Sequence, residues 1–454
     1  MFATLTKTLR VFENEIGSYT EIPAVLTSSG WLLPLVDYLL ANRSSRSLAW
    51  MERLCRSVEL FIAYVEANQK QEDTYLMFQG FAAALQTGTF NLETRLDPSG
   101  LCWSPKSTRE ARTTIIQMTE FFDWLQERRG VAAVNPRYEG TAWDRRLDQA
   151  AYRFRRDQAF LGHTWAVSNP KDGHMLRAPR APKVERDNPP AFPENRFEDL
   201  LVEGFRVGRQ PNYRDMLITL LINGAGFRYS ESFHLYVEDV IKDPWNEKMA
   251  YVQIGHPSDS DAPKDPNWVN ERGRMKTGKR RAYLAEMFGL APRHLLMDSR
   301  HAGWKGGLHE PGVVKRAYWF VPQMGEVFLT LWWRYLEQLA RYSPRSHPFA
   351  FINLSQGDKG DMYKLGKYWQ AHARACERIG LTVGKECGTT PHSHRHAYGR
   401  RLVRAKIPKE MRRKMLHHLA MESQNVYTTP SFLETAAQMA EAAERMNQKF
   451  RRDL

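Results

Sequence analysis

The chain has 454 residues, of which 42% are hydrophobic, and a formal net charge of +14. This length exceeds what one ordinary hydrophobic core supports, so we expect two or three domains, and the apolar content excludes a largely disordered chain. The excess of Lys and Arg favours a polyanionic partner, because these side chains gain free energy by displacing counterions from phosphate groups. Charge alone leaves open a basic protein that binds no nucleic acid.

Cysteine spacing and hydropathy bear on the compartment. None of the four cysteines forms a CxxC pair or a zinc-finger spacing, so we interpret them as reduced thiols of a cytosolic protein. The first residues lack the apolar stretch of a signal peptide. The most apolar early segment, 31–40, is too short for a membrane span and is interrupted by a proline and a charged residue. We therefore expect a soluble cytoplasmic protein without a membrane partner.

Apolar residues at helical spacing predict three helices in the first 130 residues. They cover 32–40, then 50–65, and then a segment that follows Ser107, in which Ile115, Met118, Phe122 and Leu125 form one stripe. We interpret the three stripes as core faces and assign residues 1–130 to a helical N-terminal domain.

Regular patterning fades between residues 131 and 195, where Arg and Pro are frequent. This composition predicts a basic, Pro-rich linker with an extended character. Such a linker is either simply solvated or, between two DNA-binding domains, follows the DNA backbone. The sequence leaves both interpretations open.

The remaining residues, 196–454, combine helices with a few short strands. A buried helix is predicted over 213–222, and further helices over 327–339, 363–379 and in three segments after Pro391. Segments 251–254 and 318–321 are rich in β-formers and bounded by turn residues, so we expect strands there. An insertion at about 256–302, with a helical patch of its own, separates them. The predicted fold class is mainly α with a small antiparallel β-sheet.

The segment around residue 391 carries the first group with chemical potential. Thr390 is a suitable N-cap and Pro391 suits the first helical position, so a helix is expected to begin here. His392 and Arg395 then lie on one face of its first turn. Helix N-terminal amides, a guanidinium and an imidazole together could stabilise a phosphate in a transition state.

A metal site is the alternative for this segment, because His392, His394 and His396 alternate. Alternation is typical of a strand and conflicts with the helix signals, and no Cys or carboxylate joins the group. We therefore expect neither a metal ion nor another cofactor.

The densest group of basic residues lies between positions 400 and 414. Ile407, Met411, Met415 and Leu419 predict the apolar stripe of a helix that would expose basic side chains. A solvated charged face is the alternative, but only Glu410 interrupts the group, so we predict contact with the DNA backbone. The basic cluster consists of Arg400, Arg401, Arg404, Lys406, Lys409, Arg412, Arg413 and Lys414.

These C-terminal segments resemble the second motif block of the tyrosine recombinase, or phage integrase, family. The block reads H-x-x-R-H from His392 to His396, followed by a helix that ends at His418, and by Tyr427 nine residues later. The family usually has Gly where His417 stands. This departure could alter the turn but leaves His418 in the aligned position.

An upstream segment resembles the family's first motif block, T-G-x-R-x-S-E. Residues 224–231 read GAGFRYSE and are followed by LYVEDV, where the family's first strand begins. The glycines allow a sharp turn, so that Arg228 can point into a cleft. The match implies that Arg228 is the first catalytic arginine and that Glu231 is the acidic residue that orients the site.

The resemblance covers the chain from about residue 195 to its end by motif. It implies a helical core-binding domain and a mixed α/β catalytic domain that form a C-shaped clamp around double-stranded DNA. The protein would be associated with the nucleoid when it is bound to DNA. It also implies a role for each aligned residue: Tyr427 as the nucleophile that forms a 3′-phosphotyrosine, Arg228 and Arg395 as ligands of the non-bridging oxygens, His392 as the group that handles the tyrosine proton, and His418 as a hydrogen-bond donor to the phosphate.

The family also uses a lysine on the hairpin between its second and third strands as the acid for the leaving 5′-oxygen. Here that hairpin carries roughly sixty residues. Lys305 is preferred because it lies in a Gly-bounded turn shortly before the expected third strand. Lys276, in a K-x-G turn, is the alternative, and Lys315 is the next to test. An ordinary DNA-contacting lysine remains open for each.

Residues 431–450 form an Ala-rich amphipathic pattern that predicts a C-terminal helix. In this family such helices dock on a neighbouring protomer, but a helix folded back on its own domain is equally acceptable. The resemblance thus implies a homotetramer on paired sites that integrates or excises a mobile element, with or without accessory proteins. A type IB topoisomerase and a non-catalytic DNA-binding relative are the competing interpretations.

Overall fold

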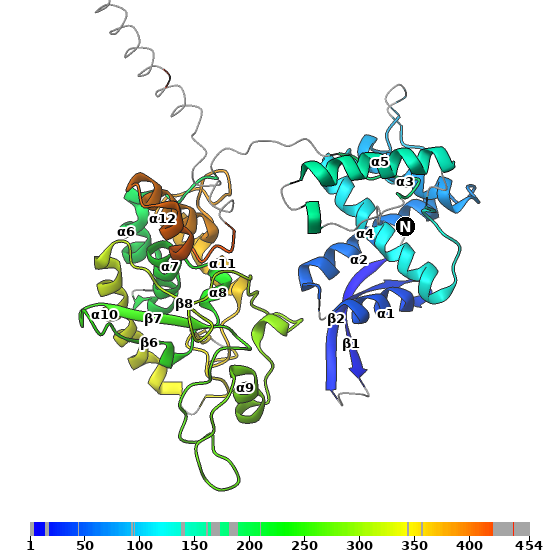
Figure 1. Cartoon of the computed structure of the whole chain (residues 1–454). Helices are drawn as coiled ribbons and strands as arrows, with labels where there is room; N and C mark the ends of the chain where they lie inside the picture. The colour runs from blue at the N-terminus through cyan, green and yellow to red at the C-terminus, as the bar shows by residue number, and fades with distance from the viewer. Residues whose placement is uncertain are drawn as a thin grey trace, which may run out of the picture. The chain divides into compact units, whose positions relative to one another are not determined.

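The computed structural model describes residues 4–420 and Met439, apart from positions 14–17, 44, 92–93, 95, 138–140, 160–161, 165–172, 181–188, 209, 343–344 and 356. The chain divides into two compact units, Met1–Val184 and Glu185–Leu454. The described part is mainly helical with small antiparallel sheets, so the predicted fold class is confirmed (Figure 1). No helix among the described residues is both long and apolar enough to cross a bilayer.

The first unit begins with three antiparallel strands that the sequence patterning did not predict. They are β1 (Leu5–Glu13), β2 (Ser18–Thr27) and β3 (Gly30–Trp31), with Leu9 opposite Ile22 in the register. Only the inner strand β2 has a run of buried apolar residues, so the sheet lacks the alternation that marks a strand in a sequence. The sheet precedes α1 (Leu33–Asn42), α2 (Leu48–Ala67), α3 (Thr74–Thr87) and α4 (Thr108–Arg129).

Three of these helices begin at a side chain that caps them. Ser47 accepts from the Trp50 amide, Asp73 accepts from the Leu76 amide, and Ser107 forms a reciprocal capping box with Glu110. Such caps satisfy backbone N–H groups that have no partner within the helix. The predicted helices α1, α2 and α4 are present, and α3 was missed.

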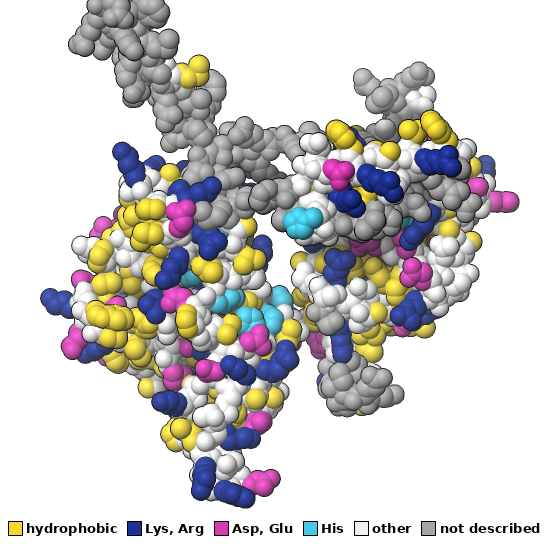
Figure 2. Space-filling view, in the orientation of Figure 1, with side chains coloured by type: hydrophobic (Ala, Val, Ile, Leu, Met, Phe, Trp, Pro, Cys, Tyr) yellow, Lys and Arg dark blue, Asp and Glu magenta, His cyan; other side chains and the backbone are white. Residues whose placement is uncertain are grey.

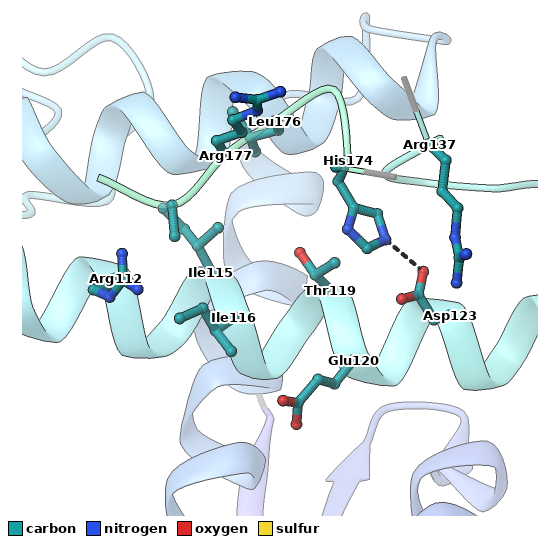
Figure 3. Close-up of a pocket in the computed structure, with 12 residues that line it drawn as sticks. Arg112, Ile115, Ile116, Thr119, Glu120, Asp123, Arg137, His174, Leu176 and Arg177 are labelled. Carbon is teal, nitrogen blue, oxygen red and sulfur yellow. Dashed lines mark hydrogen bonds and ion pairs between the residues drawn. The ribbon is translucent and has the colours of Figure 1, made fainter. Parts of the chain in front are cut away.

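Part of the predicted linker is ordered against the first unit. Helix α5 (Ala142–Gln158) lies within it and starts at a capping box between Thr141 and Asp144. Residues 173–178 run along α4, where they close a cavity of about 440 Å³ (Figure 3). His174 Nε2 lies 3.0 Å from Asp123 Oδ1, and the buried Asn135 exchanges two hydrogen bonds with the backbone of Leu176.

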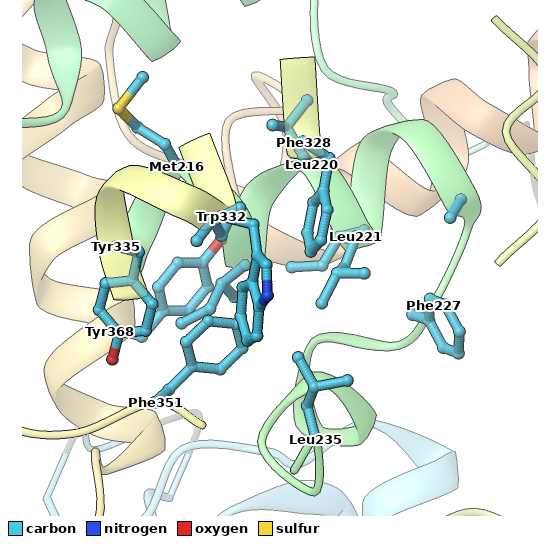
Figure 4. Packing of buried hydrophobic residues seen from close by; sticks show 14 of the residues in the cluster. Met216, Leu220, Leu221, Phe227, Leu235, Phe328, Trp332, Tyr335, Phe351 and Tyr368 are labelled. Carbon is cyan, nitrogen blue, oxygen red and sulfur yellow. The ribbon is translucent and has the colours of Figure 1, made fainter. Parts of the chain in front are cut away.

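The second unit surrounds helix α7 (Tyr213–Ala225), nearly all of which is buried. Large side chains from α10 (Pro322–Leu339) and α11 (Leu365–Arg378) pack against it, among them Trp332, Tyr335 and Tyr368 (Figure 4). The other helices are α6 (Phe197–Asp199), α8 (Tyr229–Ser232), α9 (Arg280–Phe288), α12 (Pro391–Arg404) and α13 (Lys409–Met415), with a π-helical turn at Leu200–Gly204.

A three-stranded antiparallel sheet completes this unit. Its order is β6 (Val240–Lys242), β7 (Ala250–Gly255) and β8 (Val314–Arg316), with Gln253 opposite Arg316. A separate two-stranded ribbon pairs β4 (Arg206–Val207) with β5 (Gln210–Pro211). The 58-residue connection between β7 and β8 contains α9 and the predicted insertion.

One predicted strand is wrong. Residues 318–321 are not a strand, because the pairing with β7 begins four residues earlier, over β8, and Pro322 starts α10 directly afterwards. The aromatic side chains that suggested a strand have other roles: the Trp319 indole donates to the Ala250 carbonyl at 2.7 Å. The shift brings Lys315 into the strand.

Candidate functional site

The first part of the site is the turn at the end of α7. Gly226 caps the helix with φ of 72°, and a Cβ at this position would lie 2.4 Å from Tyr398 Cδ1. Only glycine fits such a left-handed position against a ring. The chain then reverses and presents Arg228, whose amide lies 3.0 Å from Glu231 Oε2 and whose Nη1 lies 2.8 Å from Glu231 Oε1.

Glu231 is the centre of a buried charge cluster. Its Oε1 also accepts from Lys315 Nζ at 2.7 Å, and both side chains are fully buried. Burial alone would raise the pKa of Glu231, but the charges of Lys315, Arg228 and Arg395 hold it below its usual value. The pKa of Lys315 is lowered by burial, against the opposing effect of Glu231. We call Arg228, Glu231, Lys315 and Arg395 the charged cluster.

Helix α12 begins at Pro391, as predicted, and contributes His392 and Arg395. Arg395 is 1% exposed and donates to two backbone carbonyls, Leu416 O at 2.6 Å and Gly226 O. These carbonyls end α13 and α7, so one guanidinium joins three helices. A guanidinium held in this way loses little conformational entropy when it binds an anion.

His392 lies at the exposed edge of the site, with its ring centroid 4.7 Å from that of His396. Desolvation and then the nearby charges of His396, Arg395, Arg228 and Lys305 lower the pKa of His392. Its ring is therefore neutral near pH 7, and a neutral imidazole has one acceptor nitrogen. In Figure 2, His side chains gather at one place on the visible face of the second unit.

The two histidines that follow α13 have different roles. His417 occupies the position where a glycine was expected and has φ of 52°, so the left-handed turn is kept with a side chain present. Its Nε2 lies 2.9 Å from Arg316 O, and its ring lies 5.1 Å from that of Phe227. His418 is 5% exposed, and burial followed by Arg395 and Arg228 lowers its pKa to about 3.

The three lysines considered from the sequence occupy different places. Lys276 lies in the insertion, where its ammonium pairs with Glu286 of α9 instead of with a residue of this site. Lys305 is exposed, and its charge lowers the pKa of His392. Lys315 Nζ donates to the Lys305 carbonyl at 3.0 Å and lies 4.3 Å from the Trp304 ring. Sequence reasoning ranked Lys315 last, because its burial depends on Glu231, 84 residues away.

The basic cluster is less uniform than predicted. Arg401 is largely buried and binds Asn223 and Glu194, and Arg400 donates to the Pro189 carbonyl. The expected apolar stripe is wrong: α13 spans only Lys409–Met415, and Met411 and Leu419 are 56% and 70% exposed. Pro408 and the left-handed turn at His417 limit the helix to two turns. Exposed basic side chains are Arg404, Lys406, Lys409 and Lys414.

Tyr427, the predicted nucleophile, and the predicted C-terminal helix 431–450 lie outside the described residues, apart from Met439. Within the described ranges, no group of three or more His, Cys, Asp or Glu side chains is arranged to hold a metal ion.

No protein-family model matches the chain, and no curated protein matches it. Solved structures do. The XerH site-specific recombinase bound to palindromic difH substrate is 14% identical, with 87% of this chain and 80% of that chain covered and a TM-score of 0.44. The Tn1549 transposon integrase in complex with transposon right end DNA is 15% identical, with 85% and 99% covered and a TM-score of 0.34. The XerA recombinase is 12% identical, with 90% and 97% covered and a TM-score of 0.33.

Proposed function

We propose that this protein is a tyrosine site-specific recombinase that cleaves and rejoins double-stranded DNA through a 3′-phosphotyrosine at Tyr427. The observation that carries the proposal is the charged cluster. Arg228 and Arg395 are 167 positions apart in the chain. The charges of both lower the pKa of Glu231, and they also lower the pKa of His392 and of His418. Two guanidiniums and two neutral imidazoles in one region suit the charge that develops on a phosphodiester during cleavage.

In this proposal the phosphorus is attacked by the Tyr427 oxygen while the bond to the 5′-oxygen breaks. His392 accepts the phenol proton, Arg228 and Arg395 bind the non-bridging oxygens, and His418 donates a hydrogen bond to the phosphate. The phosphotyrosine conserves the energy of the phosphodiester, so attack by a 5′-hydroxyl reverses the reaction without a nucleotide cofactor.

We further propose Lys305 as the acid that protonates the leaving 5′-oxygen. Lys315 is held by Glu231, by the Lys305 carbonyl and by the Trp304 ring, so it could reach a DNA oxygen only by breaking buried contacts. Lys305 is exposed beside His392. In this arrangement Lys315 holds the turn that presents Lys305.

Covalent trapping tests the proposed function. Incubation with nicked cognate DNA is expected to give a denaturation-resistant protein–DNA adduct, and peptide mapping should locate it at Tyr427. Tyr427→Phe should bind the same DNA without forming the adduct. An adduct that persists in Tyr427→Phe would refute the assignment.

The lysine is tested with DNA in which sulfur replaces the bridging 5′-oxygen, because a thiolate leaves without protonation. Lys305→Ala should slow cleavage of normal DNA by about 10²- to 10⁴-fold and cleave the sulfur-bridged DNA at the wild-type rate. Lys276→Ala is the control and should cleave both substrates normally. Rescue of Lys315→Ala in place of Lys305→Ala would transfer the role to Lys315.

The finer features of the proposal concern assembly and biological role. We propose a homotetramer on two paired DNA sites, with the C-terminal helix exchanged between protomers, that integrates or excises a mobile element. Deletion after Leu433 should then leave cleavage of a single site intact and abolish recombination. Supercoil relaxation by a monomer without site preference would instead support a type IB topoisomerase.

A further inference from the structure

We propose that a buried chain of hydrogen bonds behind helix α12 positions Arg395 and His392, and that Asn223, His394 and His372 are positioning residues. This inference rests on the proposed function, which it deepens. The chain of hydrogen bonds begins at Arg401, in the last turn of α12, and ends at Thr389, just before its first turn.

The distances define a continuous path through the core. Asn223 Nδ2 lies 3.0 Å from His394 Nδ1, and His394 Nε2 lies 2.8 Å from His372 Nε2. His372 Nδ1 lies 3.7 Å from Cys376 Sγ, which in turn lies 3.9 Å from the Thr389 carbonyl. Asn223, His372 and His394 are each at most 1% exposed.

The partners fix the direction of the hydrogen bonds from Arg401 to His372. Arg401 donates to Asn223 Oδ1, so the Asn223 amide group must donate to His394 Nδ1. The His394 proton is then on Nε2 and is donated to His372 Nε2. His372 consequently carries its proton on Nδ1, and Cys376 Sγ packs against its ring, 3.7 Å from Nδ1 and 4.0 Å from Nε2, while the thiol donates to Thr389 O.

This direction requires both imidazoles to be neutral, because a protonated imidazole has no acceptor. A proton on His394 Nδ1 would face the Asn223 amide group, and one on His372 Nε2 would face the proton of His394. Burial lowers the pKa of His372 to about 3 and, with His372 and Arg401, holds that of His394 well below its usual value.

Both ends of the path belong to the segment that carries the proposed catalytic groups. Asn223 lies on α7 and His372 on α11, so the path ties α12 to two helices of the core. Phe192 stacks on His394 with ring centroids 4.2 Å apart and covers it. Because a shift of about 1 Å in a catalytic group costs up to about 100-fold in rate, an anchor at both ends of α12 has a measurable consequence.

The tautomers can be observed without DNA by ¹⁵N NMR of the full-length protein. We expect His394 as the Nε2–H form and His372 as the Nδ1–H form, which is the minor form of a free imidazole. In Asn223→Asp the carboxylate accepts from both Arg401 and His394, so His394 should become protonated at Nδ1. A wild-type protein with the opposite tautomers, or no change at His394 Nδ1 in Asn223→Asp, would overturn the proposal.

The positioning role is measured with His394→Leu, which removes the path but keeps an apolar side chain in the core. Cleavage of a suicide substrate should slow by about ten- to a hundredfold, with DNA affinity changed less than about threefold. The matched control is His347→Leu, because His347 is a buried histidine of the same unit that donates a hydrogen bond from Nε2 to Gly360 O, outside the path. It should cleave at the wild-type rate.

The outcomes separate the two proposals. If the wild-type protein forms no covalent adduct, the recombinase assignment fails, while the NMR result still decides the direction of the path. If the adduct forms and His394→Leu cleaves as fast as His347→Leu, the positioning role is wrong and the recombinase assignment stands. Should His394→Leu fail to fold, His372→Leu, which breaks the path at the next residue, gives the same comparison of cleavage rate with DNA affinity.

Discussion

The two sides of helix α12 bury polar groups in opposite ways. On one side the charged cluster brings Arg228, Lys315 and Arg395 around one carboxylate, Glu231. On the other side Asn223, His394 and His372 are equally buried but neutral. Burial of an ion is costly unless it is paired, and here three cations share one carboxylate. Where only position matters, a neutral chain of donors and acceptors is sufficient.

The largest expected effect on stability comes from removal of the central carboxylate. Glu231→Ala leaves Arg228 and Lys315 without their counterion, so the free energy of unfolding should fall by about 3–5 kcal/mol. Urea denaturation measures this change. Asp261→Ala, which removes the partner of Lys279 at the surface, is the matched control and should cost less than about 1 kcal/mol. Equal losses in the two variants would remove the distinction between the sites.

The pH dependence of stability should separate the buried histidines from Glu231. The histidines have folded pKa values below that of the unfolded chain, so the unfolded state binds more protons as the pH falls below about 6.5, and stability is lost there. Glu231 also has a lowered pKa, but its stabilisation is lost only below about pH 4.5. Between pH 6 and 5 the slope should therefore come from histidines, up to about 1.4 kcal/mol per pH unit for each group.

The variant His372→Leu should flatten this slope, whereas Glu231→Gln should leave it unchanged between pH 6 and 5. Thermal or urea unfolding at closely spaced pH values provides the measurement. A slope that is the same in His372→Leu and the wild type would show that the neutral path does not resist protonation.

The smallest effect concerns the turn beside the charged cluster. His417 has a left-handed backbone, in which alanine is strained and glycine is not. Both His417→Ala and His417→Gly lose the hydrogen bond to Arg316 O. The difference between their free energies of unfolding therefore measures the cost of the left-handed backbone for a residue with a Cβ. We expect His417→Ala to be less stable than His417→Gly by about 1 kcal/mol in urea denaturation. Equal stability would mean that the turn relaxes when the side chain is removed.

Local patterns predicted what depends on neighbours in the sequence. The start of α12 at Pro391, the capping of α4 and the glycine turn before Arg228 all follow from short stretches of sequence, and the structure has them. The strand at β8 was predicted to begin four residues too late because aromatic residues have a high β-propensity wherever they lie, and pairing with β7 is decided by tertiary contacts.

Long-range partners could not be predicted in the same way. Nothing in the sequence around Lys315 indicates that it pairs with Glu231. In the same way, His394 is one of three alternating histidines in the sequence, and its partner Asn223 is 171 residues away. Tyr427 remains a prediction from spacing, since it lies outside the described residues.

The long connection between β7 and β8 starts and ends at neighbouring backbone positions, because the amide of His256 donates to the carbonyl of Val313 at 2.9 Å. Because the two ends of this connection are joined by a hydrogen bond, a change in its length does not have to alter the pairing of β7 with β8. Each doubling of a flexible loop costs only about 0.6 kcal/mol in closure entropy. Descendants of this chain could therefore gain residues at the exposed tip of the connection, 270–274, at little thermodynamic cost, and a reporter domain could be inserted there, whereas the buried Trp268, Leu284 and Arg293 have to stay.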